Sequence, residues 1–264
     1  MKSSERSSIW TNNYKNSPIG LFFTLKGCFC MVNLNDYSYR YDLHIHTSPA
    51  SPCGDFSPAE VVDKYIALGY NGIVITNHFQ PKLVNKFEKP RGFVEYFLND
   101  YREAKAYGDT KDFDVILGIE MRFPENDNDY LVYGISEADA YKMLDYVYTD
   151  YETFYRGFKN EKNLVIQAHP FRKNSILQNT DLLDGIEIFN LHPGHNSTVG
   201  FAAKTAFENS RLLKTGGTDF HHETHEGMCA TLFRERIRNS FYLAEILKSR
   251  DYILDIWGNK ITLY

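Results

Sequence analysis

The sequence predicts an α/β fold in which a mostly parallel sheet, covered by helices, closes or nearly closes into a barrel. Two observations support this class. Short β-branched segments alternate with amphipathic helical ones, and about seven such units follow one another. The length of 264 residues, with 43% apolar and 24% charged residues, allows one large core without disulfides.

Composition indicates which binding partners and which cellular compartment to expect for the protein. The 29 basic and 34 acidic residues give a net charge of -5, so no basic excess indicates nucleic-acid binding. Four cysteines are too few for a disulfide scaffold in a chain of this length: Cys28, Cys30, Cys53 and Cys229. We therefore expect a cytoplasmic protein with a small-molecule partner and no membrane attachment. Neither composition nor pattern indicates the oligomeric state.

Residues 1–36 are predicted to be an N-terminal extension with little order, and residues 37–264 a single domain. Residues 1–18 are rich in Ser and Asn and lack an apolar period. The apolar stretch 19–34 is interrupted by Lys26 and is too short to span a membrane. A signal peptide is the less favoured alternative, because residues 27–30 make a poor cleavage site. Met31 is an alternative natural start.

The domain reads as alternating elements from Tyr41 onward. A capping box predicts the start of the first helix: Ser57 caps it, Pro58 suits its first turn, and Glu60 lies three residues after Ser57. That helix is expected to end at Gly69. Predicted strands are 41–46, 72–76, 115–119, 130–135, 164–168, 186–189 and 212–215. The later helices are 93–107, 137–147, 151–162, 198–208 and 241–248.

Side chains that can bind metal ions end five of the seven predicted strands. They are His44, His46, His78, Glu120, His169, Asp219 and His221. Each one alone is more often a capping or surface residue. The set exceeds the four ligands of one structural zinc site, which predicts two or three ions. Mixed imidazole and carboxylate ligands suit Zn²⁺, Mn²⁺ or Fe²⁺.

With these residues at its strand ends, the sequence resembles the PHP (polymerase and histidinol phosphatase) family of metal-dependent phosphoesterases. The motifs occur in the family's order over about 41–255: DLHIHT from Asp42, GIVITNH from Gly72, GIE from Gly118, AHP from Ala168, GIE from Gly185 and GTDFH from Gly217. The resemblance implies a distorted (β/α)7 barrel with two or three metal ions at the strand ends.

The resemblance also implies how the ligands are shared. His44, His46, Glu120 and Asp219 would hold one ion. Glu120 would bridge to a second ion that His169 also binds. His78 and His221 would hold a third, with a residue of the loop after His46.

Two positions depart from the family pattern. The loop residue of the third site is acidic or His in relatives, and here Asp55 is the first choice, with Cys53 close enough in spacing to compete. Relatives also place a His before the strand predicted at 130–135, where this chain has Asp129. A carboxylate can replace imidazole on Mn²⁺ or Fe²⁺. The alternative is that the acidic stretch 126–129 is a solvated turn.

Other polar residues have expected roles in catalysis. Arg172 follows His169 by three residues, and guanidinium geometry suits a phosphate, with a loop salt bridge as the alternative. Among His192, His195, His222 and His225, His222 is the preferred proton donor or substrate-orienting residue. Asn77 and Glu187 are expected to support ligands rather than bind metal.

The predicted function is hydrolysis of a small phosphate ester by attack of a metal-bound hydroxide on phosphorus, with Glu120, Asp219, His222 and Arg172 in the catalytic site. Two alternatives stay open: a nuclease acting on short oligonucleotides or nucleotides, and a non-catalytic regulatory module that binds metal. The intact ligand set argues against the module, and the charge balance does not support the nuclease.

Overall fold

The computed structural model describes residues 19–23 and 29–264. Its contacts divide the chain into two compact units, Met1–Asp36 and Tyr37–Tyr264. In the first unit, β1 (Ile19–Phe23) and β2 (Phe29–Asn33) form an antiparallel hairpin that the sequence pattern did not predict, and the 3-10 helix η1 (Leu34–Asp36) follows. Residues 1–18 and 24–28, where we expected little order, lie outside the described residues.

The second unit contains two six-stranded sheets. Its strands are β3 (Tyr39–Ile45), β4 (Gly72–Ile75), β5 (His78–Phe79), β6 (Asp114–Leu117), β7 (Ile119–Arg122), β8 (Asp129–Tyr133), β9 (Leu164–Gln167), β10 (Gly185–Asn190), β11 (Leu213–Gly217), β12 (Cys229–Phe233), β13 (Ile253–Ile256) and β14 (Asn259–Ile261). The first sheet has the order β14-β13-β12-β3-β4-β6, and the second has the order β11-β10-β9-β8-β7-β5.

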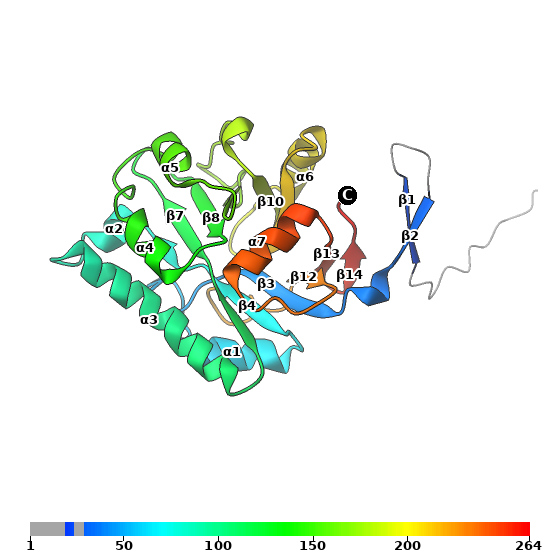
Figure 1. The fold of residues 1–264 in the computed structure, drawn as a ribbon, viewed down its shortest axis with the longest axis horizontal. Helices are drawn as coiled ribbons and strands as arrows, with labels where there is room; N and C mark the ends of the chain where they lie inside the picture. Colours follow the sequence, from blue (N-terminus) through cyan, green and yellow to red (C-terminus); the bar gives the residue numbers. More distant parts are fainter. Residues whose placement is uncertain (1–18, 24–28) are drawn as a thin grey trace, which may run out of the picture. The chain divides into compact units, whose positions relative to one another are not determined.

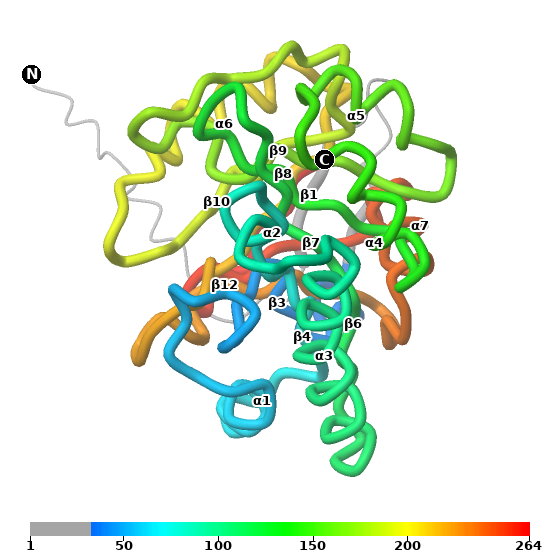
Figure 2. Tube along the Cα trace, turned by 90° about the vertical axis from the view of Figure 1, so that its left-hand side faces the viewer, coloured from blue at the N-terminus to red at the C-terminus, as the bar shows by residue number. Residues whose placement is uncertain are grey.

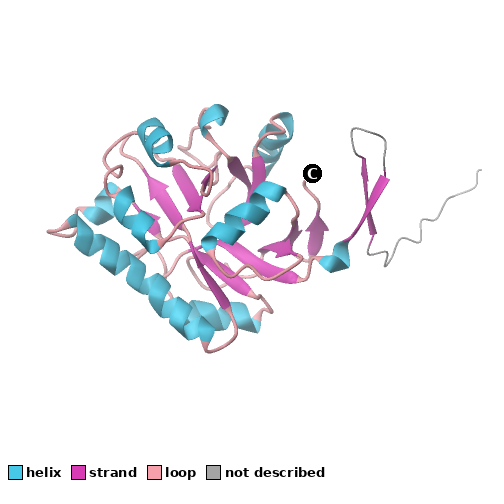
Figure 3. Ribbon diagram, viewed as in Figure 1, coloured by secondary structure: helices cyan, strands magenta, loops and turns pink. Residues whose placement is uncertain are grey.

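Helices cover the outside of these strands (Figure 3). They are α1 (Pro58–Ala67), α2 (Pro81–Val84), α3 (Pro90–Asp109), α4 (Glu137–Met143), α5 (Tyr151–Phe158), the 3-10 helix η2 (Thr180–Leu182), α6 (Val199–Glu208) and α7 (Ser240–Ser249). The predicted capping box at the start of α1 is present between Ser57 and Glu60. Figure 1 shows α1 and α3 along the outer face of β4 and β6, and Figure 2 shows the same pair from the side.

The prediction of a mostly parallel sheet is wrong, because both sheets are mixed. Strands β3, β4 and β6 are parallel, as are β9, β10 and β11. However, β8 is antiparallel to both β7 and β9, and β12 is antiparallel to β3. The connections 123–128 and 218–228 contain no helix. A parallel partner needs a long crossover, so the short connection 123–128 returns β8 antiparallel to β7. Strand β9 is antiparallel to β8 although the connection 134–163 contains α4 and α5, so connection length alone does not determine strand direction.

The two sheets approach a barrel without a continuous ladder between them. At one junction the chain passes from β6 to β7 through the single residue Gly118. A side chain does not fit there without a shift, because an added Cβ would lie 2.8 Å from Thr76 Cγ2. At the other, a single parallel bridge joins Ile45 to Phe220, with His46 N donating to the Phe220 carbonyl at 3.1 Å. The α/β class is therefore confirmed, while the closed (β/α)7 barrel is not.

The core lies between the strands and the helices, and most strand residues on both faces are buried. Tyr130 of β8 stacks on Tyr151 of α5 with ring centroids 3.8 Å apart, and Phe79 meets Phe93 edge-on at 5.0 Å. This packing fixes the strand ends that carry the site. Among the described residues, no helix has the length and apolar character required to cross a bilayer.

Candidate metal centre

Strand β3 brings two histidines to one point in the interior. His44 and His46 lie two residues apart, so their side chains share a face, as the alternation of a strand predicts. Both are buried, and their Nε2 atoms lie 3.1 Å apart. Negative charge from Asp219, Glu187 and Glu120 outweighs the effect of burial and raises the pKa of His44 well above its usual value.

Glu120 of β7 lies at the middle of the site and is fully buried. Its Oε1 is 3.2 Å from His44 Nε2 and 3.1 Å from His169 Nε2, and its Oε2 is 3.3 Å from His46 Nε2 and 2.7 Å from His78 Nδ1. Burial opposes ionisation, but the charges of His44 and His78 outweigh it and hold the pKa of Glu120 well below its usual value. Oε2 has no hydrogen-bond partner although it is buried. An orphaned carboxylate oxygen among imidazoles fits a bound cation.

Asp219, just after β11, faces the β3 histidines from the other side. Its Oδ1 lies 3.5 Å from His44 Nε2 and 3.3 Å from His46 Nε2. Asp219 has a φ of 54°, and His169, just after β9, has a φ of 30°. Both values lie in the left-handed region, which is unfavourable for residues other than glycine. The fold thus holds two candidate ligands in strained backbone, a feature that clusters at functional sites.

The candidate ligands form four groups in which all ligand atoms lie within 4.8 Å of one another. The groups are His44 with His46 and Asp219; His44 with Glu120 and His169; His78 with Glu120 and Asp129; and His46 with His78 and His221. The structure therefore brings together all seven strand-end residues, and Asp129 joins them. Imidazole and carboxylate donors in this mixture fit divalent transition-metal ions.

Asp129, the first residue of β8, is buried rather than part of a solvated turn. Its Oδ2 lies 3.8 Å from His169 Nε2. Both of its oxygens also accept hydrogen bonds from Arg122, from Nε at 2.7 Å and from Nη2 at 2.5 Å. The carboxylate is thus within reach of the expected second ion, but Arg122 already balances its charge.

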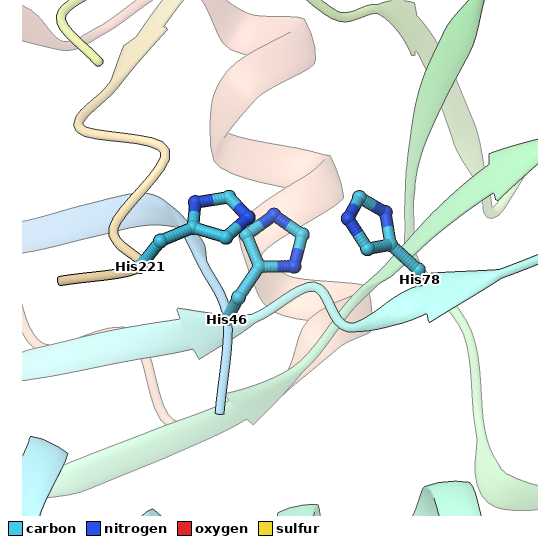
Figure 4. A group of neighbouring side chains, drawn as sticks. All are labelled: His46, His78 and His221. Carbon is cyan, nitrogen blue, oxygen red and sulfur yellow. The ribbon is translucent and has the colours of Figure 1, made fainter. Parts of the chain in front are cut away.

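In the loop after His46, Cys53 rather than the Asp55 side chain contacts His78 and His221. Asp55 is exposed, and its Oδ2 pairs with His222 Nδ1 at 2.8 Å. The Asp55 side chain, our first choice for the third site, therefore pairs with His222 rather than with His78 or His221, although the Asp55 N–H donates to the His221 carbonyl at 2.9 Å. Burial raises the pKa of Cys53, but hydrogen bonds with His221 and His78 outweigh it and lower the pKa to about 6. Figure 4 shows the His46, His78 and His221 rings facing one another.

A family model supplies the decisive comparison, since it describes the PHP domain and matches residues 42–196. The chain belongs to the PHP domain family. Comparison with curated proteins finds no matching sequence.

Solved structures show where the fold recurs. The chain is 17% identical to a two-domain protein from Bacteroides vulgatus that contains a predicted PHP-like metal-dependent phosphoesterase, with a TM-score of 0.58, and the match covers 82% of this chain and 64% of that one. PsfC from Pseudomonas syringae is 14% identical with a TM-score of 0.58, over 79% of this chain and 87% of that one. The chain thus spans less than two thirds of the Bacteroides protein, and at these identities the likeness concerns the fold.

The candidate ligands of this PHP domain are held by neighbouring polar groups. Glu187 of β10 lies 3.0 Å from His44 Nδ1 and accepts from the backbone N–H of His169 at 3.0 Å, so it fixes the positions of two candidate ligands. Asn77 donates to Thr47 Oγ1 and accepts from its backbone N–H. Gly217 is required beside the site, because an added Cβ would lie 2.4 Å from His44 Cβ.

Sequence reasoning missed two supporting residues. Asn190 ends β10 and donates to both Glu187 Oε2 at 3.0 Å and Asp219 Oδ2 at 3.1 Å. Ser51 Oγ lies 3.2 Å from His46 Nδ1 and accepts from the His78 N–H at 2.9 Å. The position of Asn190 at a strand end was a usable signal, whereas nothing in the sequence distinguished Ser51.

The remaining histidines form a rim beside the group of His46, His78 and His221. The His192 ring lies 4.5 Å from that of His195 and 4.6 Å from that of His225, and the His222 ring lies 5.2 Å from that of His225. Burial and the charges of neighbouring histidines lower the pKa of His192 to about 3, against the opposing effect of Asp219. The loops that carry these four histidines therefore lie close together, as predicted from their positions after strands.

Arg172 also reaches the centre of the PHP domain. Its Nη2 donates to Asp219 Oδ2 and, at 3.1 Å, to Asn190 Oδ1, while its Nε has no partner. The side chain is 18% exposed, and its buried Nε has a donor that no protein group accepts.

Proposed function

We propose that the protein is a metal-dependent phosphoesterase, a hydrolase that cleaves a small phosphate ester. The observation that carries this proposal is the buried Glu120 carboxylate in contact with four imidazoles. This set of buried carboxylates and imidazoles is far more stable with closely spaced cations bound than without them.

The ligands divide naturally between the ions. His44, His46, Glu120 and Asp219 would hold one ion; Glu120, His169 and Asp129 would hold a second; His78 and His221 would contribute to a third. Bound ions of this kind supply Lewis acidity and lower the pKa of water. The protein itself contributes fixed geometry, because Glu187 and Asn190 hold the ligand side chains before substrate arrives.

Arg172 binds a phosphate oxygen in this proposal. Its guanidinium already lies against Asp219, so a phosphate near the ions would lie within its reach. A hydrogen bond to a charged group is worth about 1.5–3 kcal/mol, or roughly 10–100-fold in kcat/KM. Arg172→Ala should therefore lower kcat/KM by about that factor while the metal content stays the same.

His222 gives a proton to the leaving alcohol. It is half exposed at the rim, and the Asp55 carboxylate 2.8 Å from its Nδ1 orients the ring. Its Nε2 is then free to face a substrate. This pairing gives Asp55 a role in positioning His222 instead of in binding metal.

The test is a panel of phosphate monoesters, nucleotides and a short oligonucleotide, assayed with metal-free protein and after addition of Mn²⁺, Zn²⁺ or Fe²⁺. We expect phosphate release that depends on metal and disappears in Glu120→Gln. Full activity in the metal-free protein, or no hydrolysis with any ion, would contradict the proposal. Release of mononucleotides from the oligonucleotide would instead support a nuclease.

A further inference from the structure

We propose that Cys53 is a metal ligand and that its sulfur, together with His78 and His221, makes the outer position of the centre a zinc site. This inference rests on the metal centre of the proposed function and is independent of the reaction. The outer position is the group formed by His46, His78 and His221, whose ligand atoms all lie within 4.8 Å of one another.

The Cys53 side chain is directed into this group. It makes side-chain hydrogen bonds to both His221 and His78. The rings of those two histidines flank His46, with centroids 4.2 Å and 4.4 Å from it (Figure 4). A second observation points to a cation at the same place: the buried Glu120 Oε2 lies 2.7 Å from His78 Nδ1 but accepts no hydrogen bond of ordinary geometry.

The loop backbone explains why residue 53 faces inward and residue 55 does not. A tight turn closes between Ser51 and Gly54, whose N–H donates to the Ser51 carbonyl at 2.9 Å. Ser51 Oγ anchors the start of that turn by accepting from the His78 N–H. Beyond it, the Asp55 N–H donates to the His221 carbonyl at 2.9 Å, and the Asp55 side chain leaves toward His222. The Asp55 carboxylate, which we expected in this group, therefore pairs with His222 instead.

The donor atoms differ between the outer and inner positions. Sulfur with imidazole nitrogen is a donor set that selects Zn²⁺ among the available divalent ions. The inner positions carry Glu120, Asp129 and Asp219, whose oxygens suit Mn²⁺ or Fe²⁺. A thiolate carries the same charge as the carboxylate that it replaces, so the centre keeps its charge while the outer ion changes. Cys53 lies at the exposed side, which leaves that ion open to further ligands.

The test uses the full chain carrying Cys28→Ser and Cys30→Ser, so that Cys53 and the buried Cys229 are its remaining thiols. Metal-free protein is titrated with Co²⁺, and thiolate-to-cobalt charge-transfer absorption is recorded in the near ultraviolet. We expect this absorption in the background protein, its loss in Cys53→Ser, and its retention in the matched control Asp55→Asn. Zinc competition should show binding at least about tenfold weaker in Cys53→Ser, since even indirect partners of metal ligands contribute tenfold or more.

Absence of the absorption from the background protein, or its persistence in Cys53→Ser, would overturn the proposal. Weaker zinc binding in Asp55→Asn but not in Cys53→Ser would return the role to the carboxylate. These readouts need no substrate turnover. A protein that hydrolyses phosphate esters but lacks the absorption would refute the role of Cys53 alone, while cobalt absorption without hydrolysis would refute the phosphoesterase alone.

Discussion

Removing Asp129 tests both the second metal position and the role of Arg122. Asp129→Ala deletes a buried carboxylate that lies with His78 and Glu120 in one ligand group. It also leaves the Arg122 guanidinium without its two hydrogen bonds, at 2.7 Å and 2.5 Å. The variant should therefore lose metal at the second position and lose stability even without metal.

The size of each effect follows from burial. Two charges about 4 Å apart interact by roughly 4 kcal/mol at an effective dielectric constant of about 20. The Arg122 side chain is 34% exposed and can turn to water, so we expect metal-free Asp129→Ala to lose only about 1–3 kcal/mol of unfolding free energy. Loss of the partner of a metal ligand typically lowers metal affinity by about 10–100-fold. Loss of a direct ligand should therefore lower the affinity for the second ion by at least that factor.

Metal content by elemental analysis and urea unfolding of the metal-free protein measure the two effects separately. Asp127→Ala is the matched control, because that side chain is exposed and lies 3.9 Å from Arg122 Nη1. Asn128 is unsuitable as a control, since its side chain bonds both the N–H and the carbonyl of Ile176. Unchanged metal content and turnover in Asp129→Ala would refute Asp129 as a ligand and leave it as the structural partner of Arg122.

Two further predictions separate direct ligands from their supports and address the loop thiol. Glu120→Gln should abolish hydrolysis and metal retention, whereas Glu187→Gln should cost about 10–100-fold, as measured by kcat/KM and metal content; equal effects would show that the two roles are not distinct. In metal-free protein carrying Cys28→Ser and Cys30→Ser, burial opposes ionisation of Cys53, but bonds with His221 and His78 lower its pKa to about 6. A lowered pKa keeps the thiolate populated down to that pH, so alkylation should slow only as the pH falls through about 6; a midpoint near 8 or 9 would refute this.

The strand-end ligands could be predicted because they depend on local rules. His44 and His46 share a face through strand alternation, and His78, Glu120, His169 and Asp219 follow apolar runs whose ends meet at one edge of the sheets. Alternating strands and helices likewise predicted the α/β class. Strand direction was not predicted, since the long helical connection from β8 to β9 and the short one from β7 to β8 both join antiparallel strands, and the pairing is decided only when the elements pack.

The sequence by itself determined which residue types are available for chemistry and roughly where each strand places them. Only the tertiary structure decided which of two candidates in a loop contacts the other candidate ligands, because the answer for Cys53 and Asp55 depends on hydrogen bonds to His78 and His221, which are distant along the chain. Side-chain partners of that kind form when elements pack, and a loop conformation follows the contacts that its neighbours offer more than its own residue preferences.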